Sequence, residues 1–158
     1  MKYLLFLISS ALLATNAMAD GYWGVKGASV NVDNSAYNSS FNIGAFFGAD
    51  FTEIGSNPVA LEVDITTKLI DGKVSGQNWN AQSSAVYAAM RTAKENYLKV
   101  KLGLHSTKTT VSSSSSTGSG LAYGLGFGFS GYEIEYTILK GETSNDADIN
   151  MLSVGYMF

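Results

Sequence analysis

The feature that most constrains this chain is a strict alternation of apolar and polar side chains in several short segments. In 61–66 (LEVDIT), 98–102 (LKVKL) and 132–137 (YEIEYT), every second residue is apolar and the residues between are charged or polar. Because side chains of a β-strand point alternately to its two sides, each segment has one apolar face and one charged face. The pattern predicts an all-β fold, and the two chain ends decide which face points outward.

The first residues have the features of an export signal. Lys2 supplies a positive charge, residues 3–13 form a nearly unbroken apolar run, and Ala17-Met18-Ala19 has the form of a cleavage site. The apolar run is shorter than the roughly 20 residues that span a bilayer, so a retained membrane anchor is the less favoured alternative. We therefore expect a cleaved signal peptide at 1–19 and one domain over 20–158.

The composition of residues 20–158 excludes several classes of protein. Removing Lys2 leaves nine basic and thirteen acidic residues, a net charge of −4, which argues against a nucleic-acid partner. The chain has no cysteine, so neither a disulfide nor a lipid-anchored cysteine is expected. No later segment approaches the length of a transmembrane helix, and a membrane-embedded sheet must close into a barrel because lipid cannot satisfy open strand edges.

Eight strands are predicted, with connections that alternate in length. The expected strands are 22–30, 40–51, 59–69, 84–93, 97–105, 121–130, 131–139 and 149–158. Links 31–39, 70–83, 106–120 and 140–148 are long and polar, whereas 52–58, 94–96 and the turn near 130–131 are shorter. Long loops at one end and short turns at the other are typical of outer-membrane barrels. We expect the serine-rich link 106–120 to be a loop, and a helix over 85–94 is the alternative at the one ambiguous strand.

If the apolar face of every strand points outward, the outward-facing residues include no charged residue and the inward-facing residues include ten. Five are basic and five acidic, and we predict that they form a lumen charge network: Lys26, Asp50, Glu62, Asp64, Lys68, Arg91, Lys99, Lys101, Glu133 and Glu135. An eight-stranded barrel is just wide enough for side chains to fill, and buried charges require partners. A plugged, salt-bridged lumen is therefore favoured over a narrow wet channel lined by the same charges.

The strand between the lysine pair and the glutamate pair presents small residues to this lumen. Its inward positions are Ala122, Gly124, Gly126 and Gly128. The missing side chains leave room for Lys99 and Lys101 to reach Glu133 and Glu135 across it. At the expected periplasmic strand ends, aromatic residues are predicted to form a girdle at the membrane boundary: Trp23, Phe51, Phe129, Tyr132 and Tyr156, with Phe158 beside them.

Together these features make the chain resemble the small eight-stranded outer-membrane barrels of Gram-negative bacteria, the OmpA/OmpX-like family, over its whole length after the signal. The resemblance implies an all-β, eight-stranded antiparallel up-and-down transmembrane β-barrel. It also implies that the terminal pattern Leu152, Val154, Tyr156 and Phe158 is the signal read by the barrel assembly machinery. Expected partners are outer-membrane lipid and lipopolysaccharide, and an extracellular partner of the loops is a further candidate.

Motifs for chemistry are weak. The single histidine, His105, precedes Ser106, but neighbouring residues on a strand point to opposite faces, which prevents direct activation of a serine nucleophile. A deacylase-like His-x-Ser spacing is also absent because residue 107 is threonine. The acidic residues Glu142, Asp146 and Asp148 lack the ligand spacing of a calcium loop. We therefore predict no catalytic residues, no metal site and no cofactor.

Four functions remain open from the sequence. The favoured one is a non-enzymatic barrel that stabilises the envelope and presents Ser/Asn-rich loops for interaction. The alternatives are a porin-like narrow channel for small solutes, a lipid A-modifying enzyme, and a soluble lipocalin-like barrel with its faces inverted. The last would force more than twenty large apolar side chains into a lumen too narrow to hold them.

Overall fold

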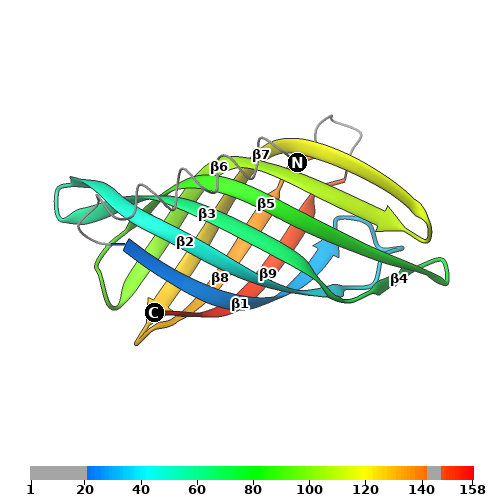
Figure 1. Cartoon of the computed structure of the whole chain (residues 1–158), viewed down its shortest axis with the longest axis horizontal. Helices are drawn as coiled ribbons and strands as arrows, with labels where there is room; N and C mark the ends of the chain where they lie inside the picture. The colour runs from blue at the N-terminus through cyan, green and yellow to red at the C-terminus, as the bar shows by residue number, and fades with distance from the viewer. Residues whose placement is uncertain (1–20, 142–146) are drawn as a thin grey trace.

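The computed structural model describes residues 21–141 and 147–158, which form a closed antiparallel barrel (Figure 1). The predicted signal peptide, 1–19, lies outside the described residues. The strands are β1 (Gly21–Val32), β2 (Ser40–Ile54), β3 (Asn57–Ile70), β4 (Gly72–Val74), β5 (Gln77–Arg91), β6 (Tyr97–Val111), β7 (Ser114–Phe129), β8 (Tyr132–Leu139) and β9 (Ile149–Met157). The predicted all-β class and eight-stranded barrel are confirmed.

Closure of the barrel follows from the strand order. Neighbours run β3-β2-β1-β9-β8-β7-β6-β5, and β3 pairs with β5 to complete the ring. The first strand pairs with the last from Gly24 with Met157 to Val32 with Ile149. The short β4 pairs with the start of β5, and the two form a hairpin that extends beyond the ring. No barrel strand therefore keeps an unpaired edge, which a strand in lipid could not tolerate.

Two segments expected to be polar loops are strands instead. Residues 70–83 contain β4 and the start of β5, and residues 106–120 continue β6 and β7 as a hairpin that turns at Ser112. In 106–120 the Ser and Thr residues show no alternation of apolar and polar side chains. The backbone nevertheless continues the hydrogen-bonded ladder, from Ser106 opposite Ser119 to Val111 opposite Ser114. The alternative helix over 85–94 is also wrong, because β5 occupies most of that segment.

The two ends of the barrel differ, although the links after β3 and β6 are much tighter than expected. Short turns join β2 to β3, β5 to β6 and β7 to β8 at the end that carries the C-terminus, and the longer connections and β4 lie at the opposite end (Figure 1). The β7–β8 turn has positive φ at both Ser130 (51°) and Gly131 (84°), the conformation that a two-residue hairpin turn requires. We name these ends the turn end and the loop end.

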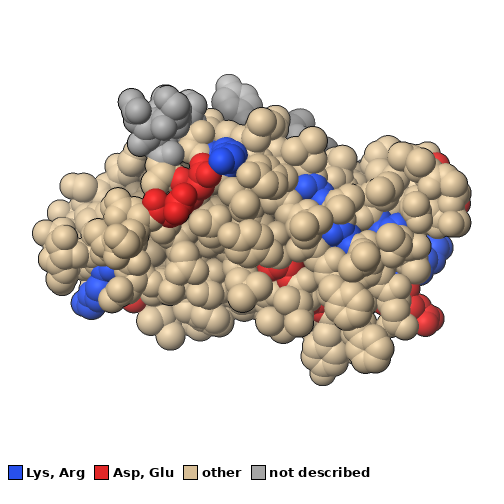
Figure 2. All heavy atoms as spheres, turned by 180° about the vertical axis from the view of Figure 1, so that it is seen from behind, with Lys and Arg blue, Asp and Glu red and all other residues tan. Residues whose placement is uncertain are grey.

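The outer face of the barrel is apolar. Twenty-five large apolar side chains of the described residues are exposed, and they alternate with inward residues along the strands; Leu125, for example, is 65% exposed. Figure 2 shows a surface between the two ends that is formed mainly by uncharged residues. Among the described residues, no helix is long and apolar enough to cross a membrane.

Candidate functional site

The barrel interior holds a cluster of buried ionised groups near the middle of its length. Lys99 on β6 lies at its centre, with its ammonium nitrogen 2.7 Å from Glu133 Oε1, 2.7 Å from Glu135 Oε2 and 3.2 Å from Glu62 Oε2. The side chains of Lys99 and Glu62 are each only 1% exposed. A buried charge without partners is very costly, so these contacts are a condition for the fold to exist.

Two further lysines complete the cluster on the side toward the loop end. The ammonium of Lys101 lies 2.6 Å from Glu135 Oε1 and 3.4 Å from Asp64 Oδ2. Lys26 pairs with Asp64 and lies 3.6 Å from Glu135 Oε1. Glu135 therefore contacts all three lysines, whereas among the lysines of the described residues Glu133 contacts Lys99 alone. We call these seven groups the lumen cluster: Lys26, Lys99, Lys101, Glu62, Asp64, Glu133 and Glu135.

Small residues on β7 make the cluster possible. A Cβ added to Gly126 would meet Cε of Lys99 at 3.4 Å, and one added to Gly124 would meet Cε of Lys101 at 3.1 Å. The two lysine side chains therefore pass over these glycines to reach glutamates on β8, two strands away. The missing side chains of β7 thus leave the space through which the two lysines reach β8.

Aromatic side chains cover the cluster toward the turn end. The phenol of Tyr97 donates a hydrogen bond to Glu133 (2.7 Å), and that of Tyr22 donates one to Glu62 (3.0 Å). Arg91 pairs with Asp50 at 2.6 Å, and its guanidinium lies 4.3 Å from the centroid of the Tyr22 ring. The inward parity of Tyr22 and Tyr97 was visible in the sequence, but the charge pattern alone did not single them out.

An apolar layer lies between the cluster and the loop end. It contains the fully buried Trp79 and Tyr87, and its other members are Ala28, Val30, Ala81, Ala85, Ala122, Leu139, Ile149 and Met151. The ammonium of Lys101 lies 4.0 Å from the centroid of the Tyr87 ring, so the two layers are in direct contact. Sequence analysis missed Trp79 because it lies in a segment that was expected to be a loop.

The ten predicted network residues do not form one group. Seven form the lumen cluster, and Asp50 and Arg91 form a separate pair nearer the turn end. Lys68 lies elsewhere: its side chain is 46% exposed and pairs with Asp71 at 3.2 Å. Its position near the end of β3 places it beyond the crowded interior, which parity alone cannot reveal.

Rings gather at the turn end on the outer face. Trp23 and Phe158 stack with their centroids 4.3 Å apart, and Tyr156 lies 5.1 Å from Tyr132 and 5.0 Å from Phe158. Phe51 and Phe129 are also exposed, near the ends of β2 and β7. Leu152, Val154, Tyr156 and Phe158 form one exposed row at the C-terminus, and the backbone N–H of Phe158 donates to the carbonyl of Trp23.

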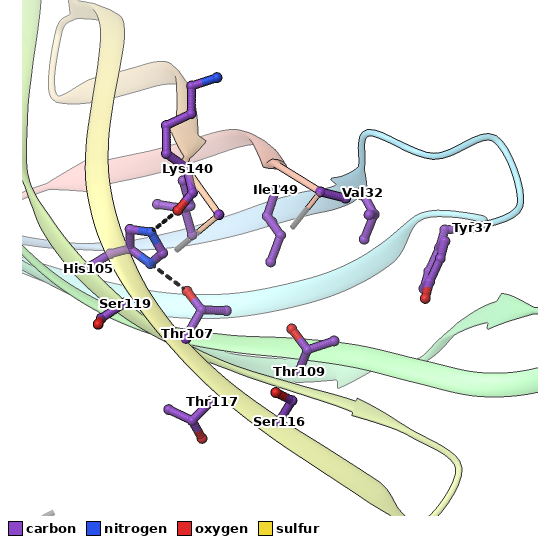
Figure 3. A pocket seen from close by; sticks show the side chains of 14 residues that line it. Val32, Tyr37, His105, Thr107, Thr109, Ser116, Thr117, Ser119, Lys140 and Ile149 are labelled. Carbon is purple, nitrogen blue, oxygen red and sulfur yellow. Dashed lines mark hydrogen bonds between the residues drawn. The ribbon is translucent and has the colours of Figure 1, made fainter. Parts of the chain in front are cut away.

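His105 lies at the base of a cavity at the loop end (Figure 3). Its Nε2 is 2.9 Å from the backbone carbonyl of Lys140, which can only accept, so this nitrogen carries the proton. Its Nδ1 lies 2.9 Å from the Thr107 hydroxyl. Both ring nitrogens are therefore occupied, and the group that orients the imidazole is a carbonyl rather than the carboxylate of a catalytic triad.

The acidic residues considered as calcium ligands give no metal site among the described residues. Glu142 and Asp146 lie outside those residues. Asp148 pairs with Lys140 and accepts a hydrogen bond from the Gly141 N–H at 3.3 Å. The hydrogen bond from the Lys140 ammonium holds the pKa of the Asp148 carboxyl below its usual value.

Comparison with solved structures shows the fold of small outer-membrane barrels. The attachment invasion locus protein Ail of Yersinia pestis is 19% identical over 89% of this chain and 99% of its own, with a TM-score of 0.57. The outer membrane protein OprG of Pseudomonas aeruginosa is 14% identical over 89% and 97% of the two chains, with a TM-score of 0.56. Neisserial surface protein A is 17% identical over 87% of this chain and 95% of its own, with a TM-score of 0.52. No protein-family model and no curated protein matches the chain.

Proposed function

We propose that this protein is an integral barrel of the bacterial outer membrane, with a closed lumen and a loop end that serves as an interaction surface outside the cell. The main support for the proposal is that the apolar face of the sheet points outward and the charged face points inward, the reverse of a soluble protein. Twenty-five large apolar side chains are exposed, while the seven ionisable side chains of the lumen cluster are buried. A soluble protein would aggregate through such a belt, whereas a bilayer accommodates it.

The exposed rings support an orientation in the membrane. Aromatic side chains favour the boundary between lipid and water, and the rings of Trp23, Phe51, Phe129, Tyr132 and Tyr156 lie toward the turn end. Because short turns face the periplasm in outer-membrane barrels, the turn end faces the periplasm and the loop end faces outward. The apolar belt contacts lipid, including lipopolysaccharide in the outer leaflet. The terminal row Leu152, Val154, Tyr156 and Phe158 would be read by the barrel assembly machinery during insertion.

Two barriers in series favour a closed lumen over a channel. The lumen cluster fills the middle of the barrel with mutually paired charges, and the apolar layer around Trp79 follows it toward the loop end. A hydrated solute would have to displace paired charges and then cross an apolar constriction. The narrow-channel alternative is favoured only if the lysines are hydrated rather than paired, and each lysine of the cluster contacts at least two carboxylates.

A non-enzymatic role fits the surroundings of His105. The Thr107 hydroxyl is within reach of the imidazole, but both groups face the interior of the barrel mouth rather than lipid acyl chains. The lipid A-modifying alternative requires a serine and an acid that converge on His105, and the group that orients this imidazole is the carbonyl of Lys140. We therefore assign the loop end to binding rather than to catalysis.

The loop end carries lysines with and without an acidic partner. Lys68 pairs with Asp71 and Lys140 with Asp148, whereas the exposed Lys73 contacts the neutral Asn78, and Lys108 is exposed on the β6–β7 hairpin. The structure of Ail has been determined in complex with the heparin analogue sucrose octasulfate, at 19% identity to this chain and a TM-score of 0.54.

The experiment that tests this proposal is a heat-modifiability assay on washed outer membranes of cells that express the protein. A folded barrel should remain with the membranes and migrate differently on SDS gels before and after boiling. Recovery in the soluble periplasmic fraction, with no shift on boiling, would contradict the proposal. An outer-membrane barrel of known heat shift serves as the positive control in the same gel.

A further inference from the structure

The cavity at the loop end has the features of a small binding site. It has a volume of about 250 Å³, and its walls come from β1, β6, β7, β8, β9, the loop between β1 and β2, and Lys140, Gly141 and Ala147 between β8 and β9 (Figure 3). The volume lies below the roughly 300–1,000 Å³ of pockets for drug-sized ligands, so it suits one small unit of a larger molecule. The apolar layer around Trp79 closes the barrel beneath it.

The loop wall of the cavity is held in place by buried contacts. Tyr37 packs edge-on against Trp79 with ring centroids 5.2 Å apart, and the Trp79 Nε1–H donates to the carbonyl of Asn38 at 2.7 Å. Trp79 is 0% exposed, and Tyr37 also forms a β-bridge with Val74. The wall is therefore preformed, which lowers the ordering cost of binding.

Hydroxyl groups are concentrated on the opposite wall. Thr109 and Ser116 face each other across the β6–β7 ladder, and Figure 3 shows both side chains at the cavity. Neither hydroxyl has a hydrogen-bond partner within the described residues, so both can donate and accept. Thr107, beside them, is held by His105 and keeps an oxygen lone pair for a ligand.

Fixed charge is scarce among the described residues that line the cavity. Lys140 is the one with a permanently charged side chain, and its ammonium points away from the cavity, toward Asp148 (Figure 3). Val32 and Ile149 add an apolar surface beside the hydroxyls. These residues offer little counter-charge to a phosphate, a sulfate or a metal ion, whereas a molecule with hydroxyls on its rim and C–H groups on its faces would match both walls.

From this arrangement we infer that the cavity binds one residue of a neutral saccharide, with the Thr109 and Ser116 hydroxyls as hydrogen-bond partners and Tyr37, Val32 and Ile149 as apolar walls. This inference rests on the proposed function, because the loop end meets surface glycans only if it faces outward. It deepens that proposal by naming the class of ligand.

The test is a titration of the refolded full-length barrel in detergent micelles, followed by backbone amide NMR. The probes are glucose, galactose and mannose, with glucose 6-phosphate as the anionic counterpart. At least one neutral sugar should give saturable shifts at 105–109 and 114–118, with a dissociation constant in the millimolar range, because few net hydrogen bonds are made. The double variant Thr109→Val/Ser116→Ala should bind about tenfold more weakly.

A matched control lies on the same two strands. The hydroxyls of Thr110 and Ser115 hydrogen-bond to each other at 3.0 Å, and these residues lie on the strand face opposite to Thr109 and Ser116. The variant Thr110→Val/Ser115→Ala should therefore bind sugar like the wild type. The inference is overturned if no neutral sugar gives saturable shifts, if the Thr109/Ser116 variant binds as tightly as the control, or if glucose 6-phosphate binds more than tenfold tighter than glucose. Heat-modifiability of each sample separates these results from a failure of the barrel itself.

Discussion

The ammonium nitrogen of Lys99 lies 2.7 Å from Oε1 of Glu133, although the strands that carry these residues are separated by a third. The contact exists because the intervening strand presents glycine at that level, so that the lysine side chain can pass over its backbone. The absence of side chains on one strand thus determines the charge pairing of its two neighbours. If the lumen is closed as proposed above, the same glycines contribute to its closure.

Gly128 provides a direct test of this relationship. A Cβ at this position would lie 2.2 Å from Cζ of Tyr97, whose phenol donates to Glu133. Gly128→Ala should therefore displace the ring and destabilise the barrel by about 1–3 kcal/mol in urea unfolding from liposomes. Gly118→Ala is the control, since nothing lies within 4 Å of the added atom, and it should stay within about 0.5 kcal/mol of the wild type. Equal stability of the two variants would disprove the close packing.

Removing charges from the lumen cluster should have unequal effects. Glu135 contacts three lysines, so Glu135→Gln leaves several buried ammonium groups short of a counter-charge and should cost about 3–5 kcal/mol of unfolding free energy. Glu133→Gln should cost clearly less, because Glu133 contacts only Lys99 among the lysines and the cluster has four acids for three bases. Lys68→Gln breaks an exposed pair and should change stability by less than about 1 kcal/mol. A reversed order in urea titrations would refute this assignment of partners.

His105 and Thr107 should act as one structural unit. His105→Ala and Thr107→Val each remove the 2.9 Å bond between them, and each should cost about 1–2 kcal/mol. The double variant should cost less than the sum of the two, since both lose the same bond. Ser106→Ala, on the opposite face, is the control. Mass spectra of lipid A from expressing cells should be the same for the wild type and His105→Ala, and a difference between them would reopen the enzyme hypothesis.

The terminal phenylalanine should matter for assembly more than for the folded barrel. Phe158 stacks on Trp23 at the turn end. Phe158→Ala should lower the amount of heat-modifiable protein in outer membranes while the purified chain still refolds into liposomes. Phe127→Ala removes another exposed phenylalanine, from β7, and serves as the matched control. Equal membrane levels of the two variants would argue against a special role for the terminal residue.

Parity alone predicted most of the barrel. Because side chains alternate strictly along a strand, the apolar sets around Leu61, Leu98 and Ile134 identified the outward face, and the charges between them identified the lumen. The same rule explains why Glu62, Lys99 and Glu135 could be placed inside without knowledge of the three-dimensional structure.

Features that depend on strand register or on distance along the barrel could not be predicted. The hairpin extensions beyond the apolar belt are built from Ser and Thr, which give no hydrophobic period, so 106–120 resembled a loop. Lys68 has inward parity but lies too near the loop end to join the cluster. Trp79 and the paired Tyr37 become neighbours only when the β1–β2 loop packs over the β4–β5 hairpin, a contact between segments about forty residues apart.

The orientation of the apolar face can be measured directly, because the chain has no cysteine and single cysteine substitutions can carry a spin label without competition. Labels at Leu102→Cys and Leu125→Cys lie in the exposed apolar belt, and a label at Ser115→Cys lies on the hairpin at the loop end. In membranes, the two belt labels should collide more with oxygen, which partitions into lipid, than with a water-soluble nickel chelate, and the Ser115 label should show the reverse. If the belt labels met the nickel chelate as often as the Ser115 label does, the apolar face would not lie in lipid, and the membrane-barrel account would be wrong.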